Sequence, residues 1–517
     1  MSAVVGIDLG TTFSAISVLN QMGRPEIVPN SDGERIMPSA LFFPENEGGK
    51  VITGVEAINS RYQSPDRCIR WIKDKMGDPD YIFNLDEYKL TPSSISAAIL
   101  KKLKDDAEQS LGQDVVDAVI TVPANFAEAA RKETMDAGQI AGLNVLGLVN
   151  EPTAAAFYYA VTHDVSGKVM VFDLGGGTFD VTIVDITGRD VNVLCSLGDR
   201  HLGGKNFDDA LLEYFQKIYM EEMEEELFDN DEDRSEIEDY CENVKKTLSK
   251  REIAKVRLNG TAGLMRTEIT QEKFSELISP YCSKIEMLIE SCLDEGEMEA
   301  SDVQNVLLVG GSSRLPMVQE IIKEIFGYDP LQVGNVDEAV SLGAALYAGF
   351  RKMEDSPEDL SEGIVSGLRD LKLSDVCNHS YGTTAFQRDE LTGKPELKNF
   401  ILIKKNTPIP CEARQVFLTA AKGQTEVIAD VTQGEGTDLS MVEHLAKEVL
   451  ELPPGRDAGK RIEITYRYDV NQRMSCVFRD EESGIEKVIE VDSQSSGQGL
   501  DIDLDEKQQA LAQLILE

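Results

Sequence analysis

Residues 169–184, VMVFDLGGGTFDVTIV, decide the fold of this chain. An apolar segment runs into Asp173, crosses three successive glycines at 175–177, and continues through Asp180 into a second apolar segment. This pattern predicts a β-hairpin whose turn carries no side chains, so that an anion can approach the backbone N–H groups closely. Because the carboxylates of Asp173 and Asp180 cannot themselves bind an anion, their presence beside the turn indicates a divalent cation.

The N-terminus repeats this pattern. Residues 4–18, VVGIDLGTTFSAISV, again contain an apolar segment that ends in an aspartate, Asp8, followed by a short polar turn and a second apolar segment. Asp8 and Asp173 are separated by the length of a domain, whereas a solenoid repeat would recur every 20 to 50 residues or so. The chain is therefore predicted to contain two related α/β lobes whose turns face each other across a cleft. Two unrelated tight hairpin turns are the alternative.

The composition excludes several classes of protein. The formal net charge of −41 over 517 residues argues against nucleic acid and anionic membrane surfaces as partners. The eight cysteines form no C-x-x-C pair and the four histidines are scattered, so neither a zinc site nor a disulfide framework is predicted. The sequence has no apolar run of the roughly 18 residues that a membrane span needs, and the first apolar segment follows Met1 too closely for a signal peptide. We therefore expect a cytoplasmic protein.

Alternating helix and strand patterns fill the rest of the N-terminal half. Residues 92–111 and 127–143 have helical spacing, and 115–122 and 145–149 are apolar strands. A third glycine turn, Gly310 and Gly311, follows an apolar segment at 306–309, the place where open α/β sheets bind ligands. The sequence contains no P-loop motif, no G-x-G-x-x-G after the first strand and no G-x-S-x-G at the third turn. With these sites excluded, we predict a nucleotide-binding cleft between two lobes.

Two further segments allow more than one interpretation. Glu242, Lys245, Lys246 and Ser249 share one helical face, which is either a surface stripe or one wall of a ligand pocket. Residues 221–239 are mostly acidic, as is usual for a solvated helix face, and no function is assigned to them.

Four segments together resemble the signature segments of the heat-shock protein 70 chaperones of the DnaK type. They are VGIDLGTT at 5–12, NEPTAAA at 150–156, DLGGGTFD at 173–180 and VGGSSR at 309–314. The resemblance covers nearly the whole chain in order. It implies an actin-like α/β ATPase domain at 1–353, with lobe I at about 1–165 and lobe II at about 166–353, and an all-β sandwich domain behind it.

The resemblance also implies roles for individual residues in this ATPase domain. The residues implied in catalysis are Lys73, Asp8, Glu151, Asp173 and Thr178. The residues implied around Mg²⁺, with K⁺ as a second ion, are Asp8, Asp173 and Asp180. The residues implied in binding ATP or ADP are Gly10, Thr11, Thr12, Gly175, Gly176, Gly177, Thr178, Gly203, Gly204, Glu242, Lys245, Ser249, Gly310, Gly311, Ser312, Arg314 and Asp337. Among these, Lys245, Ser249 and Arg314 would sandwich the adenosine.

Beyond residue 353 the composition changes. Residues 354–376 are acidic and polar and end in DLKLSDV, which resembles the interdomain linker of the family. Short β-rich runs separated by turn residues then predict an antiparallel β-sandwich at 377–500. It resembles the peptide-binding domain of the family, which implies that peptide contacts Phe386, Phe417, Ala420 and Val427. The residues implied in coupling the two domains are Pro123, Arg131, Leu371 and Leu373.

The chain departs from the family pattern at several points. Residues 501–517, predicted as a short C-terminal helix, stand in place of a long helical lid, which implies fast peptide exchange. Lys372 interrupts the apolar linker, Asn378 stands where a proline is usual, and Lys205 stands where the family carries an acid. These departures leave the interdomain coupling open.

Two functions are therefore considered. The first is an ATP-dependent chaperone that binds exposed apolar segments of unfolded proteins, assisted by a J-domain co-chaperone and a nucleotide exchange factor. The second is a nucleotide-gated binding module, or an exchange-factor-like relative, that holds a dedicated partner and hydrolyses little ATP.

Overall fold

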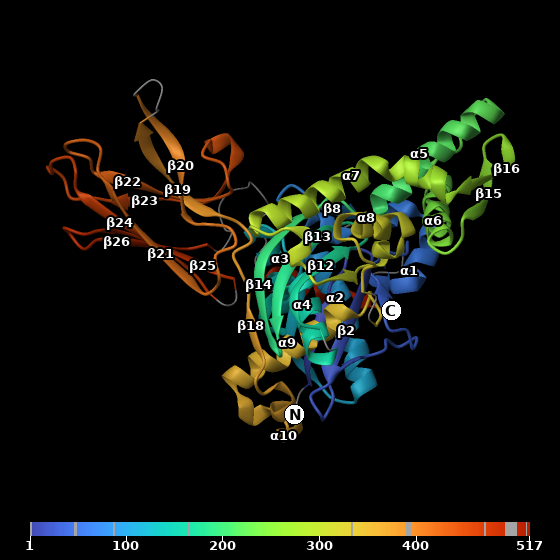
Figure 1. Ribbon diagram of the computed structural model, residues 1–517, viewed down its shortest axis with the longest axis horizontal. Helices are drawn as coiled ribbons and strands as arrows, with labels where there is room; N and C mark the ends of the chain where they lie inside the picture. The colour runs from blue at the N-terminus through green and yellow to red at the C-terminus, as the bar shows by residue number, and fades with distance from the viewer. Residues whose placement is uncertain are drawn as a thin grey trace.

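Two α/β lobes and a separate β-domain make up the molecule (Figure 1). The computed structural model describes residues 3–45, 49–85, 88–163, 165–331, 334–388, 394–469, 472–491, 504–512 and 514–516. The predicted end of the β-domain at residue 500 lies outside the described residues. The fold class is the expected one, an actin-like α/β domain followed by an all-β sandwich.

Lobe I is built on a sheet with the strand order β11-β10-β1-β2-β3, to which β4 is added beside β2. β1 pairs in parallel with β10 and in antiparallel with β2. These strands are β1 (Ala3–Asp8), β2 (Phe13–Leu19), β3 (Pro25–Ile27), β4 (Met37–Pro38), β10 (Val115–Val122) and β11 (Asn144–Asn150). Its helices are α1 (Gly54–Ser60), α2 (Pro92–Leu111), α3 (Glu128–Ile140) and α4 (Glu151–Thr162).

A smaller sheet and two short elements complete lobe I. The sheet has the order β27-β6-β5-β7, with β5 (Leu41–Phe42), β6 (Lys50–Thr53), β7 (Cys68–Ile69) and β27 (Ile515–Leu516). The hairpin consists of β8 (Phe83–Leu85) and β9 (Tyr88–Leu90), and the 3-10 turn η3 (Ile72–Lys75) carries Lys73.

Lobe II repeats the design around a sheet with the order β17-β12-β13-β14-β18. The predicted central hairpin is confirmed, because β12 pairs in antiparallel with β13 and places Asp173 opposite Asp180. The strands are β12 (Gly167–Leu174), β13 (Phe179–Thr187), β14 (Asp190–Asp199), β17 (Asn305–Val309) and β18 (Lys372–Ser374). Around them lie α5 (Gly204–Met223), α6 (Asp231–Leu248), α7 (Gln271–Glu295), α8 (Pro316–Phe326) and the hairpin of β15 (Ile253–Gly260) and β16 (Gly263–Thr270).

The two lobes share a buried core between their sheets. Residues of α4 and of α9 (Ala339–Asp355) fill this core together with apolar residues of β12, β13 and β17. The packing is close: a Cβ on Gly343 would lie 1.8 Å from the Ala154 carbonyl oxygen, and one on Gly6 would lie 2.0 Å from the Ala345 nitrogen. Glycine at these positions lets α9 lie directly against α4 and β1.

The β-domain is a sandwich of two four-stranded sheets, with the orders β20-β19-β22-β23 and β21-β24-β25-β26. Its strands are β19 (Tyr381–Arg388), β20 (Pro395–Ile403), β21 (Cys411–Leu418), β22 (Glu426–Gln433), β23 (Glu443–Glu451), β24 (Arg461–Tyr468), β25 (Met474–Asp480) and β26 (Glu486–Glu490). The pairing of β19 with β22 covers only Tyr381–Gln433 and Gly382–Thr432, whereas β19 pairs with β20 along its whole length. The first sheet is therefore open between β19 and β22.

The linker continues the sheet of lobe II. After α10 (Glu362–Leu368), β18 adds in parallel to β14, with Leu373 opposite Val191. Leu371 is buried in the shared core, whereas Lys372 points outward to within 3.6 Å of Asp190. Because side chains alternate along a strand, Lys372 does not disturb the apolar contact that Leu371 and Leu373 make.

The C-terminal segment returns to lobe I. The segment predicted as a helix contains α11 (Leu504–Ala512), but it continues into β27, which pairs in parallel with β6. Leu511 and Leu514 are buried in the core of lobe I. A strand of two residues is too short to have a periodicity of its own, and it forms only by pairing with the edge strand β6. It could therefore not be predicted from the sequence.

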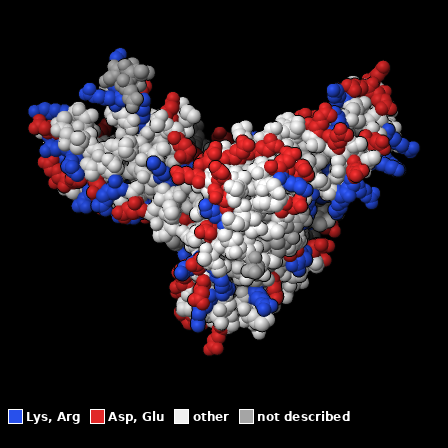
Figure 2. All heavy atoms as spheres, in the orientation of Figure 1, with Lys and Arg blue, Asp and Glu red and all other residues white. Residues whose placement is uncertain are grey.

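The surface agrees with the acidic composition. Asp and Glu side chains gather over α7 and at the far end of α5 (Figure 2). Within the described parts of the chain, no helix is both long enough and apolar enough to cross a membrane.

Candidate functional site

The two glycine-containing turns touch each other where the lobes meet. A Cβ on Gly176 would lie 2.0 Å from Thr12 Oγ1, and one on Gly177 would lie 2.8 Å from Thr11 Cγ2. Only glycine allows this approach. A hollow of about 90 Å³ opens between the turns. Its walls include Asp8, Gly10, Thr11, Thr12, Lys73, Glu151, Asp173, Gly175, Gly176, Thr178, Gly310, Gly311 and Asp337.

Buried carboxyl groups surround this hollow. Burial raises the pKa of Asp8 to about 7 and that of Asp180 to about 8, and the charge of Glu151 adds to both effects. Burial and the charge of Glu151 also raise the pKa of Asp173 well above its usual value. Asp180 Oδ1 is buried and has no hydrogen-bond partner in the described structure. The group therefore has an excess of negative charge that a cation would relieve.

Lys73 lies among these acids. Its side chain is 5% exposed, and its ammonium group forms an ion pair with Glu151. Burial favours the neutral amine, but the charges of Glu151 and Asp8 outweigh that effect and raise the pKa of Lys73. A charged lysine therefore lies among the carboxyl groups of the hollow.

The site fits Mg²⁺ bound through a nucleotide. Among the described residues, no cluster of acids, cysteines or histidines by itself forms a ready metal cage. Mg²⁺ typically takes one or two carboxylates and completes its shell with water and phosphate oxygens. Asp8 and Asp173, which both line the hollow, are suitably placed for that arrangement.

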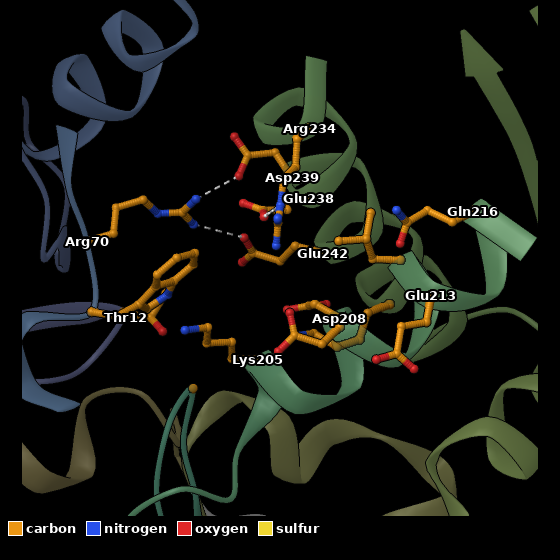
Figure 3. A pocket seen from close by; sticks show the side chains of 15 residues that line it. Thr12, Arg70, Lys205, Asp208, Glu213, Gln216, Arg234, Glu238, Asp239 and Glu242 are labelled. Carbon is orange, nitrogen blue, oxygen red and sulfur yellow. Dashed lines mark hydrogen bonds and ion pairs between the residues drawn. The ribbon is translucent and has the colours of Figure 1, made fainter. Parts of the chain in front are cut away.

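Larger cavities adjoin the hollow at Thr12. One cavity of about 490 Å³ lies between Arg70 and Trp71 of lobe I and the helices α5 and α6 of lobe II (Figure 3). Another of about 230 Å³ is lined by Phe13, Tyr62 and Trp71. The hollow between the turns is smaller than a nucleoside triphosphate, so a bound nucleotide would extend into these neighbouring spaces.

The structure brings together part of the predicted adenosine site. Lys245 forms an ion pair with Asp208 at 2.6 Å and donates a hydrogen bond to the Gly204 carbonyl oxygen. Gly204 also lies against Ser312, since a Cβ there would be 2.3 Å from Ser312 Oγ. A Cβ on Gly203 would lie 2.6 Å from the Gly177 nitrogen, so this turn also touches the central hairpin.

The other predicted adenosine residues have protein partners of their own. Ser249 donates its hydroxyl to the Lys246 carbonyl oxygen of its own helix. Arg314 forms an ion pair with Asp337 at 2.8 Å. Ser249 and Arg314 lie outside the three cavities described above. Glu242 lines the two larger cavities and pairs with Lys246 at 2.7 Å.

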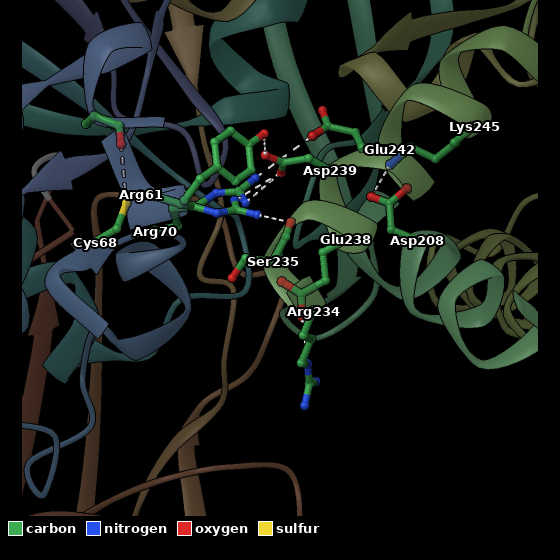
Figure 4. A network of polar contacts seen from close by, with 12 residues as sticks. Arg61, Cys68, Arg70, Asp208, Arg234, Ser235, Glu238, Asp239, Glu242 and Lys245 are labelled. Atoms are coloured by element: carbon green, nitrogen blue, oxygen red, sulfur yellow. Dashed lines mark hydrogen bonds and ion pairs between the residues drawn. The ribbon is translucent and has the colours of Figure 1, made fainter. Parts of the chain in front are cut away.

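A set of polar contacts closes the cleft between the lobes (Figure 4). We call it the interlobe clasp; its members are Arg61, Tyr62 and Arg70 of lobe I and Ser235, Asp239 and Glu242 of α6. Asp239 accepts from Tyr62 Oη at 2.6 Å and pairs with both arginines at 3.0 Å. The clasp was not predicted, because Asp239 lies in the acidic stretch at 221–239, to which no function was assigned.

Trp71 and Lys205 add a second contact across the cleft. Trp71 has a left-handed backbone, with φ of 56°, and its ring lies 4.2 Å from the Arg70 guanidinium. The Lys205 ammonium lies 4.3 Å from the other lobe's Trp71 ring, a distance typical of a cation–π contact. The lysine that replaces the family's acid thus has an aromatic partner.

A chain of polar contacts leads from the cleft to the linker. Arg131 donates to the carbonyl oxygens of Phe126 and Ala124 and, at 2.7 Å, to Asn150 Oδ1. Asn150 Nδ2 donates in turn to Asp375 Oδ2 at 3.1 Å, just after β18. Pro123, at the end of β10, accepts from the Phe126 nitrogen at 3.2 Å. Neither Asn150 nor Asp375 was predicted to couple the two domains.

The β-domain lies against both lobes. The Glu128 carboxylate of α3 accepts from Tyr381 Oη at 2.9 Å and from Tyr468 Oη at 3.1 Å. On the lobe II side, Lys405 forms an ion pair with Glu295 at 3.0 Å. Burial raises the pKa of Glu128, and its two tyrosine donors oppose that shift only in part.

The predicted peptide-contacting residues lie on both sheets. Phe386 is 67% exposed on β19, beside the opening between β19 and β22. Val427 and Phe417 are partly buried against the β-domain core, and Ala420 is exposed.

A comparison with protein-family models identifies the chain. The model described as "Hsp70 protein" matches residues 4–82 and 79–513. The chain belongs to the Hsp70 family. Members of this family are generally ATPases that bind ATP or ADP with Mg²⁺ and act on unfolded polypeptides together with co-chaperones. Membership of the Hsp70 family supports a chaperone-type nucleotide-binding function for this chain.

Proposed function

We propose that this Hsp70 protein is an ATP-dependent chaperone that binds exposed apolar segments of unfolded proteins, with ATP hydrolysis in the lobes gating peptide affinity in the β-domain. The observation that supports the proposal is that polar contacts connect the cleft to the linker. The contacting turns, Lys73 and the buried carboxyls lie at one end of a path through Asn150 and Asp375 to the linker. A change at the phosphates thus has a physical route to the β-domain.

The residues of the cleft have separate roles in this proposal. The backbone N–H groups of the glycine turns, with Thr11, Thr12 and Thr178, hold the phosphates, because a bare turn presents several donors to an anion. Asp8 and Asp173 hold Mg²⁺, which neutralises charge on the phosphate oxygens. Lys73 stabilises charge that develops on the γ-phosphoryl group, and with Glu151 it orients the attacking water.

Peptide binds in the β-domain at the opening between β19 and β22. An extended segment can add to the incompletely paired edge of β19 through its backbone, while exposed Phe386 and partly buried Val427 contact its apolar side chains. A J-domain co-chaperone and a nucleotide exchange factor act as partners. We place the protein in the cytoplasm, because all eight cysteines are free thiols.

Peptide dissociation rates measured with ATP and with ADP test the proposal. We expect faster dissociation with ATP, and we expect Asn150→Ala to remove that difference, because it breaks the path to Asp375. Asn144→Ala, at the other end of β11, is the matched control. Equal dissociation rates with both nucleotides in the unaltered protein would contradict gating.

The second candidate function is a nucleotide-gated binding module with little ATP turnover. Closure of the cleft by the interlobe clasp and by Trp71 and Lys205 favours it, because a nucleotide held behind these contacts leaves slowly. Stimulation of ATP turnover by an unfolded peptide together with a J-domain separates the two functions. Turnover that stays at its basal rate would support the binding module.

A further inference from the structure

Two pairs of thiols lie in contact in this molecule. The sulfur atoms of Cys195 and Cys292 are 3.5 Å apart, and those of Cys377 and Cys411 are 3.8 Å apart. Both separations exceed the roughly 2.05 Å of a disulfide bond, so all four side chains are free thiols. Within each pair, the sulfur atoms are close enough to react with each other after small side-chain movements.

The two pairs differ in access to solvent. Cys195 on β14 and Cys292 on α7 are both 0% exposed, within the lobe II core. Cys377 is also fully buried, but its partner Cys411, the first residue of β21, is only partly buried. Because a dissolved oxidant must reach a sulfur atom, the second pair is accessible and the first is not.

The backbone holds Cys377 close to the segment that leads into β21. The Cys377 nitrogen donates to the Thr407 carbonyl oxygen at 2.9 Å, and the Asn406 nitrogen donates to the Cys377 carbonyl oxygen at 2.7 Å. Val376 and Pro408 form a β-bridge next to this pair. The approach of the two sulfur atoms is thus fixed by main-chain pairing on one side and by the start of β21 on the other.

The hydrogen bond between the two thiols makes them unequal. A hydrogen bond from Cys377 lowers the pKa of the Cys411 thiol, whereas this bond and burial raise the pKa of Cys377. The more exposed sulfur is therefore also the one that more readily becomes a thiolate, which is the reactive form.

We propose that Cys377 and Cys411 are an oxidisable pair that forms a disulfide at the junction between the linker and the β-domain. With hydrogen peroxide, the Cys411 thiolate attacks one peroxide oxygen and becomes a sulfenic acid, and the leaving hydroxide takes up a proton to give water. The Cys377 sulfur then attacks the sulfenic sulfur, the S–S bond forms, and a second water leaves. Two thiols and one peroxide thus give one disulfide and two waters.

The disulfide would act on the contact between the β-domain and lobe I. Cys411 pairs in register with Tyr468, which donates to Glu128. Cys377 lies two residues after Asp375, which accepts from Asn150 and from Gln472, each at 3.1 Å. Drawing the sulfur atoms together from 3.8 Å to bonding distance pulls the two backbone segments toward each other, next to the residues that make these bonds. Oxidation thus loosens the docked β-domain and, with it, β18.

Mass spectrometry tests the bond itself. The full-length protein is treated with dilute hydrogen peroxide, its remaining thiols are alkylated, and it is unfolded and digested. We expect a linked pair of peptides containing Cys377 and Cys411, with Cys195 and Cys292 still reduced. Cys411→Ser removes the linked pair and Cys195→Ser, the matched control, leaves it. Oxidation of Cys195 with Cys292 first, or no link between Cys377 and Cys411, overturns the proposal.

Hydrogen exchange tests whether oxidation loosens β18. The measurement uses the unaltered protein, so it does not depend on the folding of a variant. We expect the amides of residues 372–374 to exchange at least threefold faster after oxidation and to recover after dithiothreitol is added. Exchange in Cys411→Ser should not change with peroxide. If the disulfide forms and the exchange of residues 372–374 stays the same, the pair is not a switch of domain docking.

Discussion

Asp239→Asn tests how strongly the interlobe clasp keeps the cleft closed. Asp239 accepts from one tyrosine and pairs with two arginines of the opposite lobe, and the Arg61 side chain is only 3% exposed. The substitution keeps the size of the side chain and removes its charge. It leaves the Arg61 guanidinium buried without its anionic partner, beside the Ser235 carbonyl oxygen and the Tyr62 ring, whose centroid lies 5.5 Å away.

The size of the effect follows from burial. Removing one partner of a buried ion pair typically costs 3 to 5 kcal/mol or so, and we take about 3 kcal/mol, because Asp239 keeps 14% of its side chain exposed and its amide replacement still accepts a hydrogen bond. The penalty falls on the closed cleft, since in an open cleft water solvates both groups. At about 1.4 kcal/mol per factor of ten, the open fraction rises roughly 100-fold.

Release of radiolabelled ADP into excess unlabelled ADP, followed by rapid filtration, measures this change. We expect release to accelerate by about two orders of magnitude, because nucleotide leaves through the open cleft. Glu232→Gln, an exposed acid on the same helix, is the matched control and should release ADP at the unaltered rate. A rate for Asp239→Asn within a factor of two of the unaltered protein would refute the reasoning.

Three further predictions address catalysis, the cation and the peptide. Lys73→Ala should retain ATP binding and lose about 10²- to 10³-fold in single-turnover hydrolysis, because the charge near the γ-phosphoryl group is gone; an unchanged rate removes Lys73 from the mechanism. Because the raised pKa values of Asp8, about 7, and Asp180, about 8, keep these carboxyls protonated at pH 6, Mg²⁺·ATP must displace protons there. Its affinity, measured by calorimetry, should rise from pH 6 to 8 and level off above pH 8 or so, and a flat profile would show that these groups do not titrate with binding. Phe386→Asp should weaken peptide binding at least tenfold in an anisotropy titration, whereas Ile485→Asp, at an exposed residue just before β26 of the other sheet, should not; equal effects would place the peptide elsewhere.

Much of the fold could be predicted because its signals are local. The hairpin at 169–184 combines two apolar segments with a turn of three successive glycines, and the structure pairs it as predicted. The helix α2 and the strand β10 have the predicted bounds, Pro92–Leu111 and Val115–Val122, because caps and a following proline mark their ends.

The parts that were missed depend on which distant segments pack together. Arg61 and Asp239 each look like an ordinary surface charge, and only the closed arrangement of the lobes pairs them. Lys372 looked disruptive in an apolar linker, but the alternation of β18 turns it outward. The roles of Ser249 and Arg314 in binding adenosine stay predictions, because they depend on the bound ligand.

The chain contains one tryptophan, Trp71, and it lies where the lobes meet, between Arg70 and Lys205. Its intrinsic fluorescence therefore reports on the cleft alone, without the background from other indoles that complicates most proteins of this size. Nearby cations and entering water both alter indole emission, so opening of the lobes should be visible in real time without any attached dye.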